Sequence, residues 1–197
     1  QRVTVKTNPF AALFNPASAR PDAVSFQSAL STTGFVSQVP NLATNNINTF
    51  FMSINDTFNG GQSTEAPGLD SDYPAQFGAA PSPFRTAIRA KLASIGSALT
   101  PANIVDRAQT QSCAGYHQLS NNRSLGGGLV WPPSLGFVHI SEVQQELCNG
   151  GPCWTLSPAL KNVFLPARKQ TLETFLNTTA CLTCGASITA RAAGPAP

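Results

Sequence analysis

A thiol and an imidazole lie one helical turn apart in the run Cys113-Ala-Gly-Tyr116-His117, and the chain's other histidine, His139, follows downstream. A cysteine and two imidazoles are ligands for copper or zinc, with His117 and His139 as the expected metal ligands and Tyr116 nearby. The thiol could instead be a nucleophile, with His139 as its base and Glu142 as the orienting carboxylate. The residue types therefore allow a metal site or a cysteine-dependent enzyme.

A structural interpretation of the same residues stays open. Cys113 could be a small buried residue on a helix face, and His117 could cap that helix through its carbonyls. His139, between Val138 and Ile140, could be a hydrogen-bonded core histidine. The sequence contains no Gly-x-Ser-x-Gly, no His-Glu-x-x-His and no phosphate-binding loop, so it offers no motif for the enzyme classes that these patterns define.

The same run is close to Cys-x-x-Cys-His, the pattern that attaches a haem through two thioethers and one imidazole. Tyr116 stands where the second cysteine would be. The segments Arg-Ala-Gln-Thr-Gln-Ser-Cys-Ala-Gly-x-His-Gln-Leu-Ser (107–120) and Leu-Gly-Phe-Val-His-Ile (135–140) resemble the haem-attachment region of c-type cytochrome domains. More narrowly, they resemble the C-terminal part of uncharacterised exported proteins of myxobacteria and other proteobacteria. The specific match covers about residues 104–170.

This resemblance implies a covalent haem c. Cys113 would form the single thioether, His117 would be the proximal ligand, and His139 would be the distal ligand, with Tyr116 beside them. Ligands on both faces of the iron favour electron transfer, hence a redox partner protein. Two other functions stay open. One is a haem-less binding or structural module, stabilised by disulfides and without a cofactor. The other is a secreted metal-dependent or cysteine-dependent enzyme that uses Cys113, His117 and His139.

The remaining cysteines form two close pairs, Cys148 with Cys153 and Cys181 with Cys184. In an exported protein these pairs indicate two disulfides, either local or linking the pairs. A four-cysteine zinc site and a redox-active dithiol at Cys181 and Cys184 are the alternatives. In each case Cys113 is left over.

Composition limits the compartment and the partners. Charged residues make up 11% of the chain and the net charge is +3, without a dense run of Lys and Arg. We therefore expect no nucleic-acid partner. No apolar stretch approaches the length of a membrane span. The cysteine pairs, together with a first residue that is Gln rather than Met, favour an exported protein whose leader has been removed, or a piece of a longer precursor. The resemblance implies that the protein is bacterial and is secreted or periplasmic.

Hydrophobic spacing and caps predict helices that must position this chemistry. The expected helices cover residues 44–58, 83–99, 101–117 and 157–177. Between residues 119 and 156, glycine and proline runs predict little regular structure, and Trp131 either pins this loop or packs on a planar ligand as part of a flap. The expected fold is mainly α, a small helical domain with long irregular loops that is cytochrome-c-like around the motif. We expect one domain over residues 1–185, with its motif-bearing part at about 101–177, and an Ala-, Gly- and Pro-rich tail at 186–197.

Overall fold

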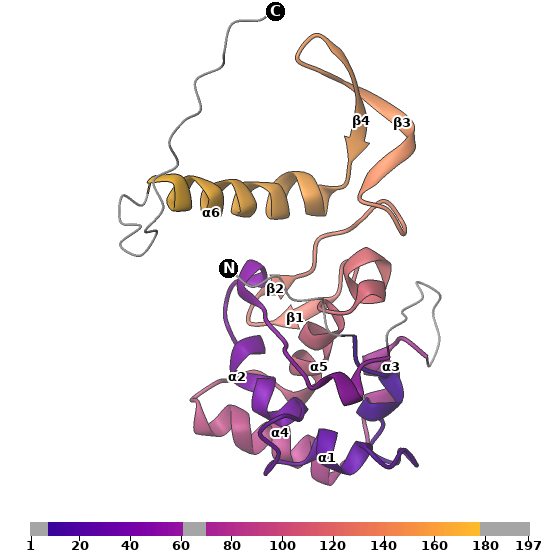
Figure 1. Ribbon diagram of the computed structural model, residues 1–197, viewed down its shortest axis with the longest axis vertical. Helices are drawn as coiled ribbons and strands as arrows, with labels where there is room; N and C mark the ends of the chain where they lie inside the picture. Colours follow the sequence, from indigo (N-terminus) through magenta and orange to yellow (C-terminus); the bar gives the residue numbers. More distant parts are fainter. Residues whose placement is uncertain (1–7, 61–69, 178–197) are drawn as a thin grey trace, which may run out of the picture.

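A computed structural model describes residues 8–60 and 70–177 of the chain. Of these, 47% are helical and 15% lie in strands or bridges, so the protein is a mixed α and β structure. The expectation of a mainly α fold is therefore wrong, because two small antiparallel sheets, β1–β2 and β3–β4, form where irregular loops were expected (Figure 1). Cys181, Cys184 and the expected tail at 186–197 lie outside the described residues.

The elements follow one another in this order, with η marking 3-10 and π-helical turns: η1 (Ala11–Phe14), α1 (Ala23–Gln27), η2 (Phe35–Gln38), α2 (Val39–Leu42), η3 (Ile47–Thr49), η4 (Asp56–Phe58), α3 (Tyr73–Phe77), α4 (Pro83–Ser94), α5 (Pro101–Gln109), η5 (Gly115–Leu119), β1 (Ser124–Gly126), β2 (Leu129–Val130), β3 (Ile140–Cys148), β4 (Gly151–Leu156), η6 (Leu160–Phe164) and α6 (Leu165–Asn177).

The start of α4 confirms the prediction from its cap. Ser82 Oγ accepts a hydrogen bond from the Arg85 backbone N–H, and Pro83 occupies the first turn, where its missing N–H costs nothing. The helix ends at Ser94 rather than at residue 99, because Gly96 adopts a positive φ of 66°. The buried face of α4 consists of Phe84, Ile88 and Leu92.

Helix α5 leads into the motif but ends before it. Thr100 and Asn103 cap its start reciprocally, each side chain accepting from the backbone N–H of the other. The expected helix over 101–117 stops at Gln109, and the motif continues into the π-helical turn η5. A Cβ at Gly115 would lie 1.8 Å from the Gln109 carbonyl oxygen, so this turn closes only around a glycine.

The helix expected over residues 44–58 is wrong. Phe50, Met52 and Ile54 are buried while the residues between them are exposed, which is the period of two of an extended chain. Phe51, which the helical spacing placed on the buried face, is 54% exposed. The helical spacing of the apolar residues Ile47, Phe51, Ile54 and Phe58 therefore does not correspond to a helix in the structure.

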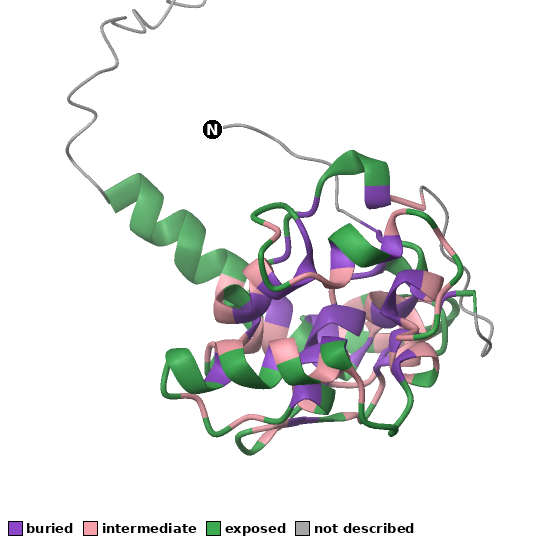
Figure 2. Ribbon diagram, turned by 90° about the horizontal axis from the view of Figure 1, so that it is seen from below, coloured by how far each residue is buried: buried purple, intermediate pink, exposed green. Residues whose placement is uncertain are grey.

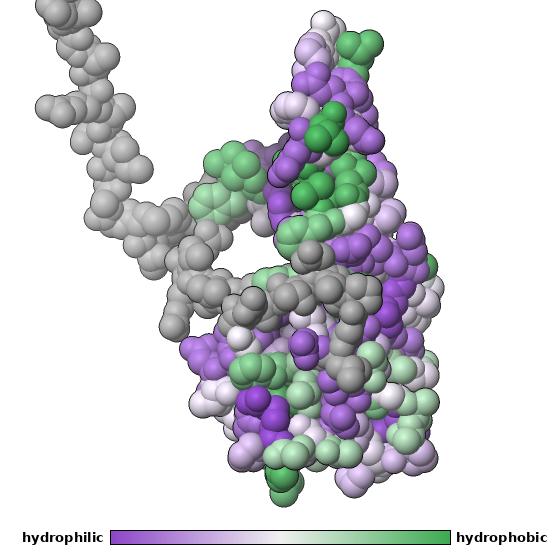
Figure 3. Space-filling model, turned by 90° about the vertical axis from the view of Figure 1, so that its right-hand side faces the viewer, coloured by the Kyte–Doolittle hydropathy of each residue, from purple (hydrophilic) through white to green (hydrophobic). Residues whose placement is uncertain are grey.

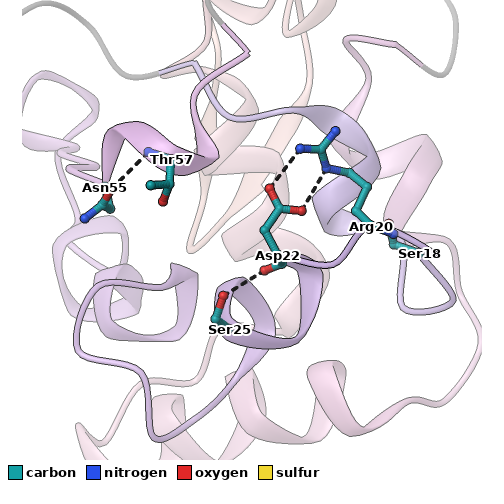
Figure 4. Close-up of polar contacts among 6 residues, drawn as sticks. All are labelled: Ser18, Arg20, Asp22, Ser25, Asn55 and Thr57. Carbon is teal, nitrogen blue, oxygen red and sulfur yellow. Dashed lines mark hydrogen bonds and ion pairs between the residues drawn. The ribbon is translucent and has the colours of Figure 1, made fainter.

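Asparagine side chains start the two short turns that replace this helix. Asn46 Oδ1 accepts from the Asn48 backbone N–H at 2.9 Å, and Asn55 Oδ1 accepts from the Thr57 N–H at 3.0 Å (Figure 4). Such local bonds compete with the helical ladder and favour turns.

The elements from η1 to β2 form the lower part of the molecule in Figure 1, which we call the lower body. An aromatic cluster forms its centre. The Phe14 ring stacks on Tyr73 at 4.1 Å and meets Phe26 and Phe35 edge to face at 5.0 and 4.9 Å. Phe84 of α4 closes the cluster against Phe35 at 5.8 Å. These rings come from distant parts of the chain, so they join η1, α1, η2, α3 and α4 into one core.

Arg107 ties α5 to its neighbours from inside this core. Its side chain is 1% exposed, and its guanidinium donates to four backbone carbonyls, those of Leu42, Thr44, Leu125 and Gly126. Burial without a carboxylate partner lowers the pKa of Arg107. The residue therefore satisfies the ends of α2 and β1 at once.

The two hairpins correct the expectation of little regular structure between 119 and 156. A run of three glycines turns β1 into β2, and Asn149-Gly150, both with positive φ, turns β3 into β4. A disulfide joins Cys148 to Cys153 across the second turn, so of the two pairings that the sequence left open, this pair has the local one.

Helix α6 and the β3–β4 hairpin project from the lower body (Figure 1), and Figure 2 shows α6 as an exposed helix that extends away from it. The helical prediction for 157–177 is confirmed in η6 and α6, and the turn before Pro166, which has no N–H to donate, is π-helical. However, α6 has no buried residue, and the side chains of Leu172, Phe175 and Leu176 are 57 to 69% exposed. Among the described residues, no helix has the length and apolar character needed to cross a membrane.

Candidate functional site

His139 is held by both of its ring nitrogens and is 9% exposed. Nε2 lies 3.1 Å from the Tyr116 carbonyl oxygen, and Nδ1 lies 2.8 Å from Ser157 Oγ. A carbonyl can only accept, so Nε2 carries the hydrogen and the Ser157 hydroxyl donates to Nδ1. Ser157 Oγ in turn accepts from the Leu160 N–H at 3.0 Å. His139 thereby connects η5, β3 and η6.

His117 lies beside this histidine in a different role. Its Nδ1 donates to the Phe137 carbonyl oxygen at 2.7 Å, and its ring stacks on Phe137 with centroids 4.6 Å apart. The rings of His117 and His139 are 5.6 Å apart, centroid to centroid. The fold therefore brings together the two histidines that the sequence singled out.

The donor set does not fit the bis-histidine haem that the resemblance implies. Iron would need a ring nitrogen of His139, and each one bonds to the protein. Tyr116 stands in the place of the second cysteine, and its ring packs in an aromatic cluster. The ring centroid lies 4.6 Å from His139, 5.3 Å from Phe164 and 6.4 Å from Trp131. We therefore derive no chemistry through a haem.

Cys113 carries the thiol of the motif. It is exposed and forms no disulfide within the described part of the chain. Burial raises the pKa of Tyr73, and the neighbouring Cys113 thiol adds to this shift. Searched over the described residues, Cys113, His117 and His139 do not gather as one set of metal ligands.

The alternative metal and thiol arrangements have their own geometry. Glu146, Cys148 and Cys153 place their ligand atoms within 4.8 Å of one another, but the disulfide engages both sulfurs. Glu142 is exposed on β3, whereas Nδ1 of His139 faces Ser157, so the expected orienting contact between Glu142 and His139 is replaced by a serine.

A groove of about 570 Å³, lined in part by Tyr116, opens between η3, the end of α5 and α6. Its aromatic floor includes Phe50, Trp131 and Phe164, which are 7, 2 and 6% exposed. On the face drawn in Figure 3, hydrophobic side chains gather on the upper part of the molecule. The lining residues are Ile47, Asn48, Phe50, Thr110, Gln111, Tyr116, Trp131, Phe164, Ala167, Arg168, Thr171, Leu172 and Phe175.

Trp131 has the first of the two roles that the sequence left open, which is to pin its loop. Its backbone N–H donates to the Arg123 carbonyl and its carbonyl accepts from Asn122, so it pins the loop. Its ring also lies 5.4 Å from Phe164 and lines the groove. No local sequence pattern marks Phe50, Phe164 or Arg168 as groove residues, because they meet only through the tertiary fold.

Comparison with known proteins identifies no family for this chain. The resemblance to c-type cytochrome domains consequently stays a prediction carried by residues 107–120 and 135–140. No family model, no curated protein and no solved structure matches the chain.

Proposed function

We propose that the protein is an exported, disulfide-stabilised binding module without a haem, and that it takes a small apolar ligand in the groove beside Tyr116. The groove itself supports this proposal most directly: about 570 Å³, with a floor of buried aromatic rings. Small-molecule sites typically occupy 300 to 1,000 Å³ and are lined by apolar and aromatic side chains with a few polar groups.

The lining has the chemistry of a selective apolar site. Tyr116 and Phe164 stack at 5.3 Å with an interplanar angle of 24°, and Trp131 packs on Phe164 at 49°. Rings held by one another lose little freedom when a ligand arrives, so binding costs little ordering. Thr110 and Gln111 at the end of α5 add polar groups that could orient the ligand.

The Cys148–Cys153 disulfide supports the export part of the proposal, because disulfides persist in oxidising compartments. It staples a hairpin that leads, through Ser157, into the wall of the groove. The proposed role of the disulfide is to hold this connection in place outside the cell or in the periplasm.

Trp131 provides a direct test. The chain has two tryptophans, so Trp154→Phe leaves Trp131 as the sole indole. Titration of this variant with the neutral apolar probe N-phenyl-1-naphthylamine should give saturable one-to-one binding, with energy transfer from Trp131. The transfer locates the probe near the groove rather than on an exposed surface.

A matched pair of substitutions decides the location. Ala167→Phe, added to Trp154→Phe, fills the groove and should abolish saturable binding. Ala90→Phe adds the same volume to the exposed side of α4 and should leave binding unchanged. Circular dichroism would check that both variants fold. Unchanged binding in folded Ala167→Phe, or no saturable binding in the parent, would overturn the proposal.

A further inference from the structure

A second hollow lies along the same helix. It measures about 690 Å³ and is lined by Lys161, Leu165, Pro166, Arg168, Lys169 and Leu172. Arg168 and Leu172 line both this hollow and the aromatic groove. The two spaces therefore meet at the side chains of one arginine and one leucine of α6.

The charged side chains that line the two spaces are all cationic. Among the described residues that line the aromatic groove, Arg168 alone is charged, and the second hollow adds Lys161 and Lys169. The described lining of either space includes no carboxylate. An anion placed at the junction would therefore meet attraction from α6 without repulsion from the walls.

Arg168 is the cation available to a ligand. Lys161 Nζ lies 3.2 Å from Glu146 and Lys169 Nζ lies 3.7 Å from Glu173, so each lysine has its own carboxylate. Arg168 forms no ion pair within residues 8–60 and 70–177. One uncommitted guanidinium matches a head group with a single negative charge, and its planar fork suits a carboxylate.

We propose that the ligand is a single-chain amphiphile with a carboxylate head, that is, a medium- or long-chain fatty acid. This inference rests on the proposed function and names the ligand class of the same groove. The acyl chain lies along Phe50, Trp131 and Phe164, and the carboxylate binds Arg168 where the two hollows meet. A neutral chain of equal length fills the same floor but lacks a partner for the guanidinium.

The experiment compares two ligands that differ only in the head. Dodecanoate and 1-dodecanol each displace N-phenyl-1-naphthylamine from the Trp154→Phe protein at low ionic strength. Dodecanoate should bind about tenfold more tightly, which is the effect of a charge-assisted arginine–carboxylate bond of about 1.4 kcal/mol. Adding Arg168→Gln should weaken dodecanoate binding about tenfold relative to dodecanol binding and so remove this difference. The matched control is Arg89→Gln, which makes the same change on the exposed side of α4 and should keep the difference.

The outcomes separate this inference from the proposed function. Equal affinities for the two ligands in the parent protein, or a preference for dodecanoate that survives Arg168→Gln, would overturn the carboxylate assignment and leave the apolar groove standing. An equal loss for both ligands in Arg168→Gln would also overturn it, because the arginine would then only support the shape of α6. Absence of probe binding in the parent would overturn both proposals together.

Discussion

Gly115 is a residue whose replacement tests the geometry of the motif directly. A methyl group there would sit 1.8 Å from the Gln109 carbonyl oxygen, which is backbone and cannot swing away. Gly115→Ala should therefore lower the free energy of unfolding by roughly 3 kcal/mol, despite the better helix propensity of alanine. Urea denaturation measures the change. Gly151→Ala, where a Cβ meets no atom within 4 Å, is the control and should shift stability by less than about 0.5 kcal/mol.

Asp106 gives the molecule a defined pH dependence. Burial raises the pKa of Asp106, although the Arg123 guanidinium, 2.9 Å away, opposes the shift. The folded state then binds more protons than the unfolded state at pH values between the ordinary and the raised pKa, so stability falls as pH rises through that interval. Urea unfolding from about pH 3 to pH 6 should show this fall in the wild type and not in Asp106→Asn.

Arg123→Gln is the informative companion to that experiment. It removes the hydrogen bond and charge that lower the pKa of Asp106, so the fall in stability with rising pH should become steeper or extend to higher pH. A fall that shrinks in this variant, or that persists in Asp106→Asn, would show that another group controls the dependence.

The residues of the motif could be found from the sequence, but their contacts could not. The spacing of Cys113 and His117 suggested one α-helical turn, whereas a π-helical turn begins between them, at Gly115. The proximity of His117 and His139 depends on the loop that brings Phe137 back over η5. No local sequence pattern predicts the path of this loop, because the histidines bind backbone carbonyls, which every residue has.

Two helix starts allow a matched comparison of serine hydroxyls at the scale of elements. Ser82 caps α4 through one bond, whereas Ser157 caps the η6–α6 segment and also donates to His139. Ser82→Ala should cost about 1 kcal/mol. Ser157→Ala should cost about 2 kcal/mol, because it also leaves a buried imidazole nitrogen without its donor. Equal losses, measured by urea denaturation, would show that the bond between His139 and Ser157 adds no stability.

The β3–β4 hairpin should respond to its disulfide locally. Val143 and Leu147 are each 87% exposed, so the hairpin contributes little to the core, and a two-stranded sheet is marginal alone. Replacing Cys148 and Cys153 by alanine should speed amide exchange in β3 and β4, while the midpoint of thermal unfolding of the body changes by no more than a few degrees. A loss of protection in α4 and α5 to the same extent would contradict this independence.

Local signals predicted elements where side chains act on their own backbone. Ser82-Pro83 and Thr100-Pro101 specify helix starts through caps that need no tertiary partner. The Asn149-Gly150 dipeptide carried an equally local signal for the hairpin, which the cysteine pairing obscured. The helix predicted over residues 44–58 is wrong because its apolar spacing is accidental. Turns started by asparagine side chains, and the packing of Phe50 against Arg107, determine the structure there instead.

At the scale of the whole molecule, stability is uneven. The aromatic cluster and Arg107 hold the lower body, and the core extends into the upper part through Leu160 and Phe164. Beyond Phe164, α6 has no buried residue, yet it carries the wall of the proposed ligand groove. An element that binds a ligand is expected to come from the weakly held part of a structure, because it must open for the ligand to enter.

This unevenness predicts the order of proteolysis. Of the basic residues in the described part of the chain, Arg168 and Lys169 lie on the exposed α6, whereas Arg107 is buried and Lys91 sits on α4, which packs into the core. Limited trypsin digestion followed by mass spectrometry should therefore detect cleavage at Arg168 or Lys169 before cleavage at any basic residue of α4 or α5. Early cleavage within α4 would mean that the body opens as readily as α6. If dodecanoate occupies the groove, saturating amounts should slow the cut at Arg168 and leave the rates in the body unchanged, because the bound ligand stabilises folded α6 and not its unfolded form.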